Sequence, residues 1–538
     1  MWRVKPLDAI LATAEKKALH RSLGPVQLTL LGIGAVIGTG IFVLTATAAQ
    51  KAGPGMMISF IIAGAVCAVA ALCYSELASM VPVAGSAYTY SYAVMGELVA
   101  WLVGWALILE YALGASAVAV GWSGHMIGLL DNVGLHLPHA LTVGPKVVIG
   151  SFLEGGEAGG IVNLPAVIIT ILVTALLVIG TKESATANAV LVAIKVAALT
   201  LFIVITIPMV SGHMDHFKPF TPRGWGNPLD HTGTGVLGAA ASIFFAYVGF
   251  DAVSTAAEET RNPQRNVPIG LIASLLICTV FYLLAAAGAI GSYGAQPMVG
   301  ADGHPFASGS PDLAAACTAL GAHTPLVCSK EALAYALRET GHPFFGQLVA
   351  LAATIALPSV VLMMMFGQTR IFFVMARDGL LPTPLSAVHP KFKTPWVITI
   401  VTGIVVAIFA AFLPVGQLAD YSNSGTLFAF AAVSVGVMVL RFTDKNRVRP
   451  FRTPALFIIA PLSIVGCIAL FVSLDGKSQG LFAVWTLIGL VFYFGYGFWN
   501  SNVRRGVIDV PELDPNAPHP AVAPMPGAVA PGDAAERG

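Results

Sequence analysis

Long apolar runs separated by short polar segments fill the chain from about residue 28 to residue 500. The runs at 162–179 and 395–413 contain no ionisable side chain. About 20 apolar residues are enough for a helix to cross a bilayer. We therefore predict an all-α integral membrane protein with about twelve transmembrane helices. The predicted spans are 28–50, 55–80, 98–128, 162–179, 186–210, 235–257, 267–291, 344–371, 395–413, 421–441, 454–474 and 480–500.

Glycine-rich segments interrupt the first and the sixth predicted spans. One runs from Gly32 to Phe42 and the other from Phe244 to Asp251. Glycine destabilises a helix interior by roughly 1 kcal/mol relative to alanine, and unwound backbone at membrane depth must face protein or a wet cavity. Close helix packing explains one isolated cluster. A pair of broken helices in corresponding positions of two halves instead favours a transporter's binding site.

Two groups of five spans, each beginning with a broken helix, suggest an internal repeat. Because five is odd, the second group enters the membrane from the opposite side. We predict inverted repeats at 28–210 and 235–441, followed by helices 11 and 12 in 454–500. Residues 1–27 are predicted to be a cytoplasmic N-terminal segment. The Pro/Ala-rich residues 501–538 are predicted to be a disordered cytoplasmic tail.

Composition and charge predict where the protein is located and how it is oriented in the membrane. Of the 538 residues, 56% are hydrophobic and 10% are charged, too apolar a mixture to cover a soluble surface. The segments on one predicted side hold 20 of the 28 lysines and arginines and the opposite segments hold 7, while Lys195 lies inside a span. Positive charge marks the cytoplasmic side. We predict a bacterial inner-membrane protein with both termini in the cytoplasm and no nucleic-acid partner.

Cys317 and Cys328 share the long loop between the seventh and eighth spans. Their spacing permits a disulfide, and two free thiols explain the sequence equally well. The remaining cysteines fall in spans, where small packing roles are expected.

The two breaks offer complementary backbone groups. A helix broken at Gly38, Thr39 and Gly40 exposes amides, and free N–H groups at a helix N-terminus bind anions. A break at 245–249 exposes carbonyls that suit an ammonium group. An α-amino acid is the simplest ligand that carries both charges. The stretch from Gly32 to Gly38 also looks like a glycine-rich nucleotide-binding loop. We reject that interpretation, because no strand, βαβ unit or following acidic residue accompanies it.

Three ionisable residues stand near the middle of predicted spans, namely Glu110, Lys195 and Asp251. Such residues are costly in a membrane and mark function by default. Burial disfavours the charged form of lysine, so Lys195 can gain and lose a proton during transport. Snorkelling and permanent pairing with Glu110 or Asp251 are the alternatives, and the central position argues against snorkelling. We predict proton coupling through these three residues.

Mixed charges follow the sixth span at Glu258, Glu259 and Arg261. Salt bridges among them would form a gate that closes the cytoplasmic side. An ordinary solvated loop is the alternative, and local chemistry does not separate the two.

Three motifs together resemble the cationic amino acid transporter branch of the amino acid–polyamine–organocation superfamily. They are Gly32–Phe42, Phe245–Pro268 and Arg370–Pro382. The resemblance extends from about residue 20 to residue 500. It implies the 5+5 inverted-repeat fold shared with LeuT, with discontinuous helices 1 and 6. It also implies alternating access around a midplane site.

The resemblance implies roles for individual residues. The substrate carboxylate would meet the amides of Thr39 and Gly40. Lys195 looks like a fifth-span lysine that bacterial members carry where sodium-coupled relatives bind sodium, and Glu110 is similar to a third-span glutamate tied to proton coupling. The substrate amine would meet the carbonyls of Val36, Phe245 and Val248.

Met364 departs from the branch's pattern. Animal members that carry arginine and lysine have a small serine there, counting back without gaps from Arg370. A methionine would fill the side-chain pocket and favour small neutral amino acids such as alanine. The expected function is therefore proton-coupled import of small neutral L-amino acids, with no cofactor or metal. A small single-span membrane subunit is an open partner.

Other functions explain less of the sequence. Transport or exchange of cationic amino acids or polyamines is the first alternative, although a polyamine lacks a carboxylate for Gly38–Gly40. A membrane-embedded enzyme would use Glu110, Lys195 and Asp251 as acid–base groups, but no span contains HExxH or GxSxG. A channel would need rings of like charge or repeated filter carbonyls, and these are missing.

Overall fold

The structure is a computed structural model of the chain. It describes residues 4, 23–81, 86–149, 153–157, 159–180, 185–251, 253, 260–301, 303, 305–320 and 324–506. Most of the predicted N-terminal segment 1–27, residues 507–538 of the predicted tail, and the gate residues Glu258 and Glu259 lie outside the described residues.

Helices make up most of the described chain. Seven are long and apolar enough to cross a membrane, and five more apolar helices are shorter. In chain order the twelve spans are α2 (Pro25–Val36) with α3 (Thr39–Phe42) and α4 (Leu44–Ala52); α5 (Met56–Met80); α7 (Glu97–Asn132); α8 (Leu164–Ile179); α9 (Ala185–Val210); α10 (Gly235–Ile243) with the 3₁₀ turn η5 (Phe244–Tyr247); α12 (Pro263–Tyr293); α15 (Pro343–Arg377); α16 (Trp396–Phe412); α17 (Val415–Thr443); α18 (Leu456–Val472); and α19 (Gly476–Phe492) with the π-turn η9 (Tyr493–Gly497) and α20 (Phe498–Asn500).

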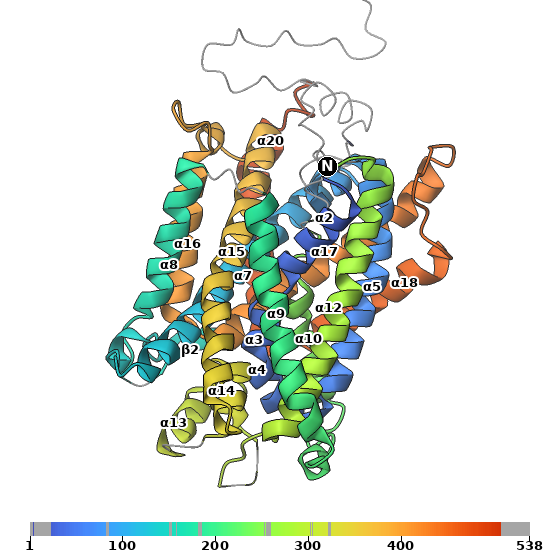
Figure 1. The fold of residues 1–538 in the computed structure, drawn as a ribbon. Coiled ribbons are helices and arrows are strands. Elements are labelled where there is room, and N and C mark those ends of the chain that lie inside the picture. Colours follow the sequence, from blue (N-terminus) through green and yellow to red (C-terminus); the bar gives the residue numbers. More distant parts are fainter. Residues whose placement is uncertain are drawn as a thin grey trace, which may run out of the picture.

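Short elements connect the spans. They are η1 (Gly53–Gly55), α6 (Ser86–Val94), η2 (His139–Leu141), the antiparallel hairpin of β1 (Val147–Ile149) and β2 (Leu153–Gly155), η3 (Met214–Phe217), η4 (Pro228–Asp230), α13 (Pro311–Leu320), η7 (Leu326–Cys328), α14 (Ala332–Glu339) and η8 (Thr383–Ser386). We call the end of the bundle where α2 begins and α20 ends the termini face, and the end that carries α13, α14 and the hairpin the loop face (Figure 1).

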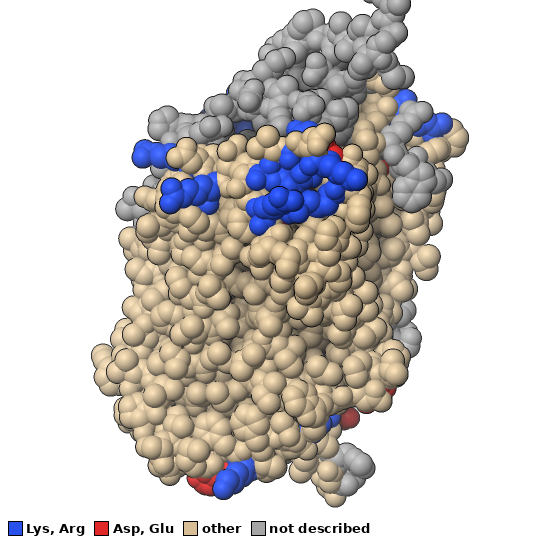
Figure 2. Space-filling view, turned by 90° about the vertical axis from the view of Figure 1, so that its right-hand side faces the viewer, with Lys and Arg blue, Asp and Glu red and all other residues tan. Residues whose placement is uncertain are grey.

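The side of the bundle is apolar between these two faces. Exposed residues such as Ile171, Val204, Leu276 and Ile468 point away from the core. On the side that Figure 2 shows, lysine and arginine gather near the termini face, above a broad belt without charged side chains. An apolar belt on a helical bundle is the surface that a bilayer covers.

The helix contacts repeat between the two halves. α2 packs on α12 as α10 packs on α5, α9 packs on α12 as α17 packs on α5, and α7 packs on α17 as α15 packs on α9. In each of these three comparisons, the second pair of helices is obtained from the first by replacing each helix with the span five places before or after it in the chain. The predicted all-α fold with a LeuT-like 5+5 inverted repeat is confirmed.

Several span boundaries differ from those predicted, and two of these differences have a clear physical cause. α12 begins at Pro263 rather than residue 267, because proline is well tolerated in the first helical turn, where its missing N–H has no helical acceptor. α17 begins at Val415 rather than residue 421 and includes the polar turn around Asp420. Hydropathy detects the apolar stretch, whereas the helix also includes polar residues that find partners inside the protein.

Candidate functional site

Span 1 breaks between α2 and α3. α2 ends at Val36, Ile37 is extended, and Gly38 precedes the first residue of α3, Thr39. The break is therefore at Ile37 and Gly38, and Thr39 and Gly40 are the first helical residues rather than unwound ones. The first amides of a helix lack intrahelical acceptors, so those of Thr39 and Gly40 are suited to bind a carboxylate.

Span 6 opens at the predicted place. α10 ends at Ile243, η5 follows, and the chain then turns through Val248 and Gly249. Gly249 has φ +107°, and a Cβ there would lie 3.0 Å from the carbonyl oxygen of Ala35. Glycine is therefore required by both the backbone conformation and the close approach of span 1. The carbonyl of Phe245 accepts an internal bond from Val248 N at 3.2 Å.

The two breaks lie against each other. Gly40 packs directly on the backbone of Ala246, where any Cβ would clash. Tyr282 of α12 contacts both segments, because its Oη lies 2.8 Å from the carbonyl oxygens of Val36 and of Ala246. A phenol has one proton and each carbonyl has two lone pairs. The carbonyls at this junction therefore keep acceptor capacity for an ammonium group.

Four spans converge beside the junction. A Cβ at Gly114 of α7 would lie 3.2 Å from Met364 Sδ, 3.3 Å from Ser422 Oγ and 3.7 Å from Phe245 Cε2. Val360, one turn before Met364 in α15, has its Cγ2 3.4 Å from the Cβ position of Gly38. Met364 is thus buried next to the break in span 6.

Lys195 reaches span 1 just before its break. Its Nζ donates a 2.7 Å hydrogen bond to the carbonyl oxygen of Gly34, and the side chain is buried. Neighbouring Cys278 lies close enough to interact with the ammonium charge. This lysine therefore connects α9 to the end of α2.

The two predicted carboxyl groups belong to a second buried cluster. Tyr111 Oη donates to Asp251 Oδ2 at 3.0 Å. Glu110 precedes Tyr111 in α7, is fully buried, and is close enough to Asp251 for the two carboxyl groups to interact electrostatically. The backbone carbonyl of Glu110 accepts a 2.8 Å bond from Ser422 Oγ. The cluster is thus linked to the wall that contains Met364.

Of the predicted cytoplasmic gate, the structure describes only Arg261. Its backbone N–H donates to the carbonyl oxygen of Leu23 at 2.8 Å, and Thr260 forms an isolated parallel bridge with Leu23. The segment that leaves span 6 is therefore attached to the start of span 1 at the termini face.

A buried ion pair on the loop-face side was missed by sequence reasoning. Lys51 Nζ lies 2.7 Å from Asp420 Oδ2, and Ser242 hydrogen-bonds both side chains. The first predicted span, 28–50, ends one residue before Lys51 and so leaves this lysine in a loop. That placement is wrong, because α4 continues past it and the side chain is only 6% exposed. Tyr282 and Ser422 were also missed, since nothing local distinguishes them from other polar residues in spans.

A bundle of apolar spans with two broken helices meeting at a buried polar centre defines a membrane transporter. The chain belongs to the amino acid permease family, whose model, described as "Amino acid permease", matches residues 23–493. This confirms the resemblance noted from the motifs.

Three relatives illustrate the range of the family. The branched-chain amino acid permease BcaP of Bacillus subtilis (strain 168) is 43% identical over 498 residues, which cover 93% of this chain and 97% of the relative. The methylthioribose transporter of the same strain is 41% identical over 506 residues, 94% and 99% of the two chains. The vacuolar cationic amino acid transporter 4 of Arabidopsis thaliana is 35% identical over 438 residues, 80% and 65%. These names support a transporter rather than an enzyme.

Proposed function

We propose that this permease imports small neutral L-amino acids, such as alanine, together with protons. The observation that carries the proposal is the contact of Met364 Sδ with the position of Gly114, next to Phe245. A thioether and a phenyl ring at this place favour a neutral side chain on the substrate. The name of the branched-chain relative favours neutral aliphatic side chains as well, so leucine is the second substrate to test.

Backbone groups supply the rest of the recognition. The amides of Thr39 and Gly40 hold the carboxylate at the N-terminus of α3, and Gly38 lets the chain turn there. The carbonyls of Val36, Phe245 and Val248 hold the ammonium group. Because the two breaks are in backbone contact, both charges of one amino acid are bound within a few ångströms. Movement of either half-helix then opens or closes the site, as alternating access requires.

Proton coupling is proposed to act through Lys195. Hydrogen bonds from a charged donor are roughly twice as strong as neutral ones, so the protonated lysine holds Gly34 more firmly than the neutral lysine does. Loss of the proton loosens α2 at its broken end. Glu110 and Asp251 form the second proton-accepting cluster, in contact with the substrate wall through Ser422.

The sidedness follows from charge. The positive charge gathered near the termini face (Figure 2) supports both termini in the cytoplasm of a bacterial inner membrane. The loop face is then outside, and the ion pair of Lys51 and Asp420 closes that side. Glu258, Glu259 and Arg261 are proposed to close the cytoplasmic side. The proposed repeats are 28–210 and 235–441, with 454–500 outside them.

Methylthioribose is a second candidate substrate. A relative that is 41% identical over nearly its whole length is named as its transporter. This sugar thioether carries neither a carboxylate nor an ammonium group. It would leave the amides of Thr39 and Gly40 without their proposed ligand, which makes it the less favoured candidate.

A competition experiment tests the substrate assignment. Uptake of radiolabelled alanine into proteoliposomes should be inhibited by unlabelled alanine and leucine, but not by alanine methyl ester, arginine or methylthioribose. The ester keeps the amine and side chain and loses only the negative charge. Competition by the ester would contradict a carboxylate site at Thr39 and Gly40. Uptake of radiolabelled methylthioribose, with no uptake of alanine or leucine, would instead make the sugar the substrate.

A further inference from the structure

The bundle contains a second space that the central site does not use. A cavity of about 400 Å³ opens on the loop face, a size within the range of small-molecule sites. Its walls come from α4 and the residue before it, from α7, from the loop between α7 and α8, from the start of α17 and from the loops that carry α13 and η7. Both apolar and polar side chains line it, among them Val43, Thr47, Val120, Ser123 and Val415.

One part of the cavity wall is charged. The carboxylate of Glu157 lies 3.0 Å from Lys330 Nζ and 3.1 Å from His139 Nε2. Burial opposes the charge on Glu157, but Lys330 and His139 outweigh it and hold the pKa of that carboxyl below its ordinary value. The wall thus offers an anionic group and a cationic group side by side.

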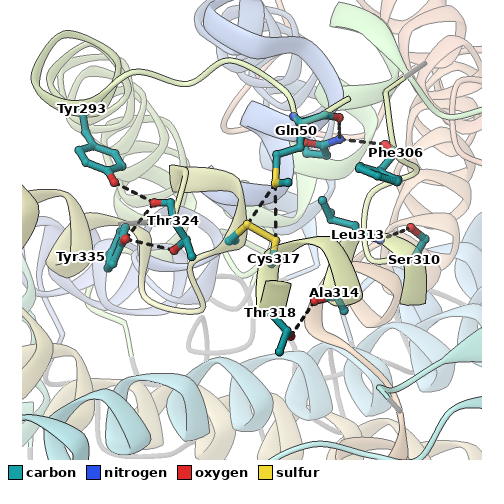
Figure 3. The surroundings of a disulfide bond; sticks show 12 residues. Gln50, Tyr293, Phe306, Ser310, Leu313, Ala314, Cys317, Thr318, Thr324 and Tyr335 are labelled. Carbon is teal, nitrogen blue, oxygen red and sulfur yellow. Dashed lines mark hydrogen bonds between the residues drawn. A yellow bond between two sulfur atoms is a disulfide. The ribbon is translucent and has the colours of Figure 1, made fainter. Parts of the chain in front are cut away.

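The cavity wall also contains a disulfide. A disulfide joins Cys317 to Cys328, both of which line the space. Figure 3 shows this bond next to the loop that Gln50 of α4 holds through hydrogen bonds of 3.0 Å to Met298 O and 2.9 Å to Phe306 O. Met298 and Phe306, of which Met298 contacts both cysteine sulfurs, are therefore attached to α4, the helix that follows α3 in span 1.

The cavity wall includes a residue close to the break in span 1. Val43 lines the cavity and lies 3.2 Å from the Cβ position of Gly121, which also packs directly on the Thr39 side chain. Thr39 and Val43 are one helical turn apart, about 6 Å along the axis. The cavity therefore ends about one turn from the amides proposed to bind the carboxylate.

We propose that this cavity is an outer binding site that holds one zwitterionic amino acid before it enters the central site. The ammonium group binds Glu157, the carboxylate binds Lys330, and an aliphatic side chain packs on Val43, Val120 and Val415. The ligand's ammonium group then takes the place of Lys330 beside Glu157, and its carboxylate takes the place of Glu157 beside Lys330, so both side chains keep a partner of opposite charge. The substrate class rests on the proposed function, and the second site is the new claim.

Binding stoichiometry tests the proposal in the intact protein reconstituted in nanodiscs. At saturating radiolabelled leucine, the wild type should bind two molecules per chain. The double variant Glu157→Gln, Lys330→Met should bind one, and its KM for uptake should rise about tenfold with kcat unchanged. Asp131→Asn is the matched control. It removes an exposed carboxylate that pairs with His136 at 3.0 Å on the same face but does not line the cavity, so it should still bind two.

A cysteine placed in the cavity gives an independent measurement. The free cysteines are all buried, so Thr47→Cys should provide the reactive thiol, and leucine should protect it from a charged methanethiosulfonate reagent. One molecule per chain in both wild type and double variant, or labelling of Thr47→Cys that leucine does not slow, would overturn the outer site and leave the central one standing. No binding of leucine or alanine at all would instead refute the proposed function.

Discussion

Lys195 Nζ and the carbonyl oxygen of Gly34 are joined by a buried 2.7 Å hydrogen bond. The bond connects span 5 to the last turns of α2, directly before the break at Ile37 and Gly38. Moving a helix that carries this bond requires the lysine to find another acceptor or to lose its proton. The proposed coupling therefore follows from where the lysine is attached, and not only from its burial.

The side-chain pocket is tested by Met364→Ser. Removing the thioether next to Gly114 and Phe245 should admit larger or cationic side chains, so arginine should become a competitor of alanine uptake. Met363→Ser is the control, because Met363 precedes Met364 in α15 and is only partly buried. Competition constants for alanine, leucine and arginine measure the change. Unchanged selectivity in Met364→Ser would place the cap of the pocket elsewhere.

The link between the two breaks is tested by Tyr282→Phe. Loss of a buried hydroxyl partner costs about 1–3 kcal/mol, so thermal unfolding should occur at lower temperature. Tyr293→Phe is a matched control, because Tyr293 Oη also donates to a backbone carbonyl, that of Thr324 at 2.8 Å, but at the loop-face end of α12, away from the junction. Both variants should lose similar stability, but only Tyr282→Phe should transport alanine more slowly than its stability loss explains. Equal transport rates would contradict a role for Tyr282 at the junction.

The buried ion pair on the loop-face side predicts a strong double-mutant coupling. Lys51→Met leaves Asp420 buried without its cation, and removing one partner of a buried pair typically costs about 3–5 kcal/mol. The double variant Lys51→Met, Asp420→Leu should recover most of that loss. Unfolding in detergent, measured for the wild type, both single variants and the double variant, gives the coupling. Additive losses would show that the two side chains do not stabilise each other.

Glu157 predicts an acid-labile contribution to stability. Its folded-state pKa is lowered because Lys330 and His139 outweigh the effect of burial. A lowered carboxyl pKa adds stability above the unfolded value, about 4.3 for glutamate, and this stability is lost as the pH falls through the folded pKa. Wild type should therefore unfold at higher temperature than Glu157→Gln at about pH 6, and the two should converge in more acidic buffer. A constant difference would contradict this assignment.

Sequence reasoning located both breaks because their cause is local. Glycine at positions 38 and 249 is visible in the chain, and apolar runs of span length locate the helices around it. The placement of Thr39 and Gly40 inside α3 was missed, since glycine weakens a helix without fixing where it ends. This position at the start of α3 suits the proposed carboxylate site, because a helix N-terminus presents amides better than an irregular loop does.

What the sequence could not predict depends on contacts between distant segments. Lys51 and Asp420 are separated by 369 residues, and only the folded bundle reveals that each neutralises the other. Tyr282 bridges two carbonyls that no pattern assigns to it. The position of Met364 was predicted by counting residues back from Arg370 along the sequence. Its contact with Gly114, however, depends on how α15 packs against α7. This side-chain pocket is formed by helices from both repeats, and the composition of either helix alone does not predict it.

The most direct test of the account is alanine accumulation in proteoliposomes without sodium, under an inwardly directed proton gradient. The wild type should concentrate alanine, and collapsing the gradient with a protonophore should abolish accumulation. Lys195→Ala should lose gradient-driven accumulation while still exchanging internal for external alanine, which confirms that the variant is folded and binds substrate. Accumulation by Lys195→Ala equal to that of the wild type would contradict proton coupling through this lysine.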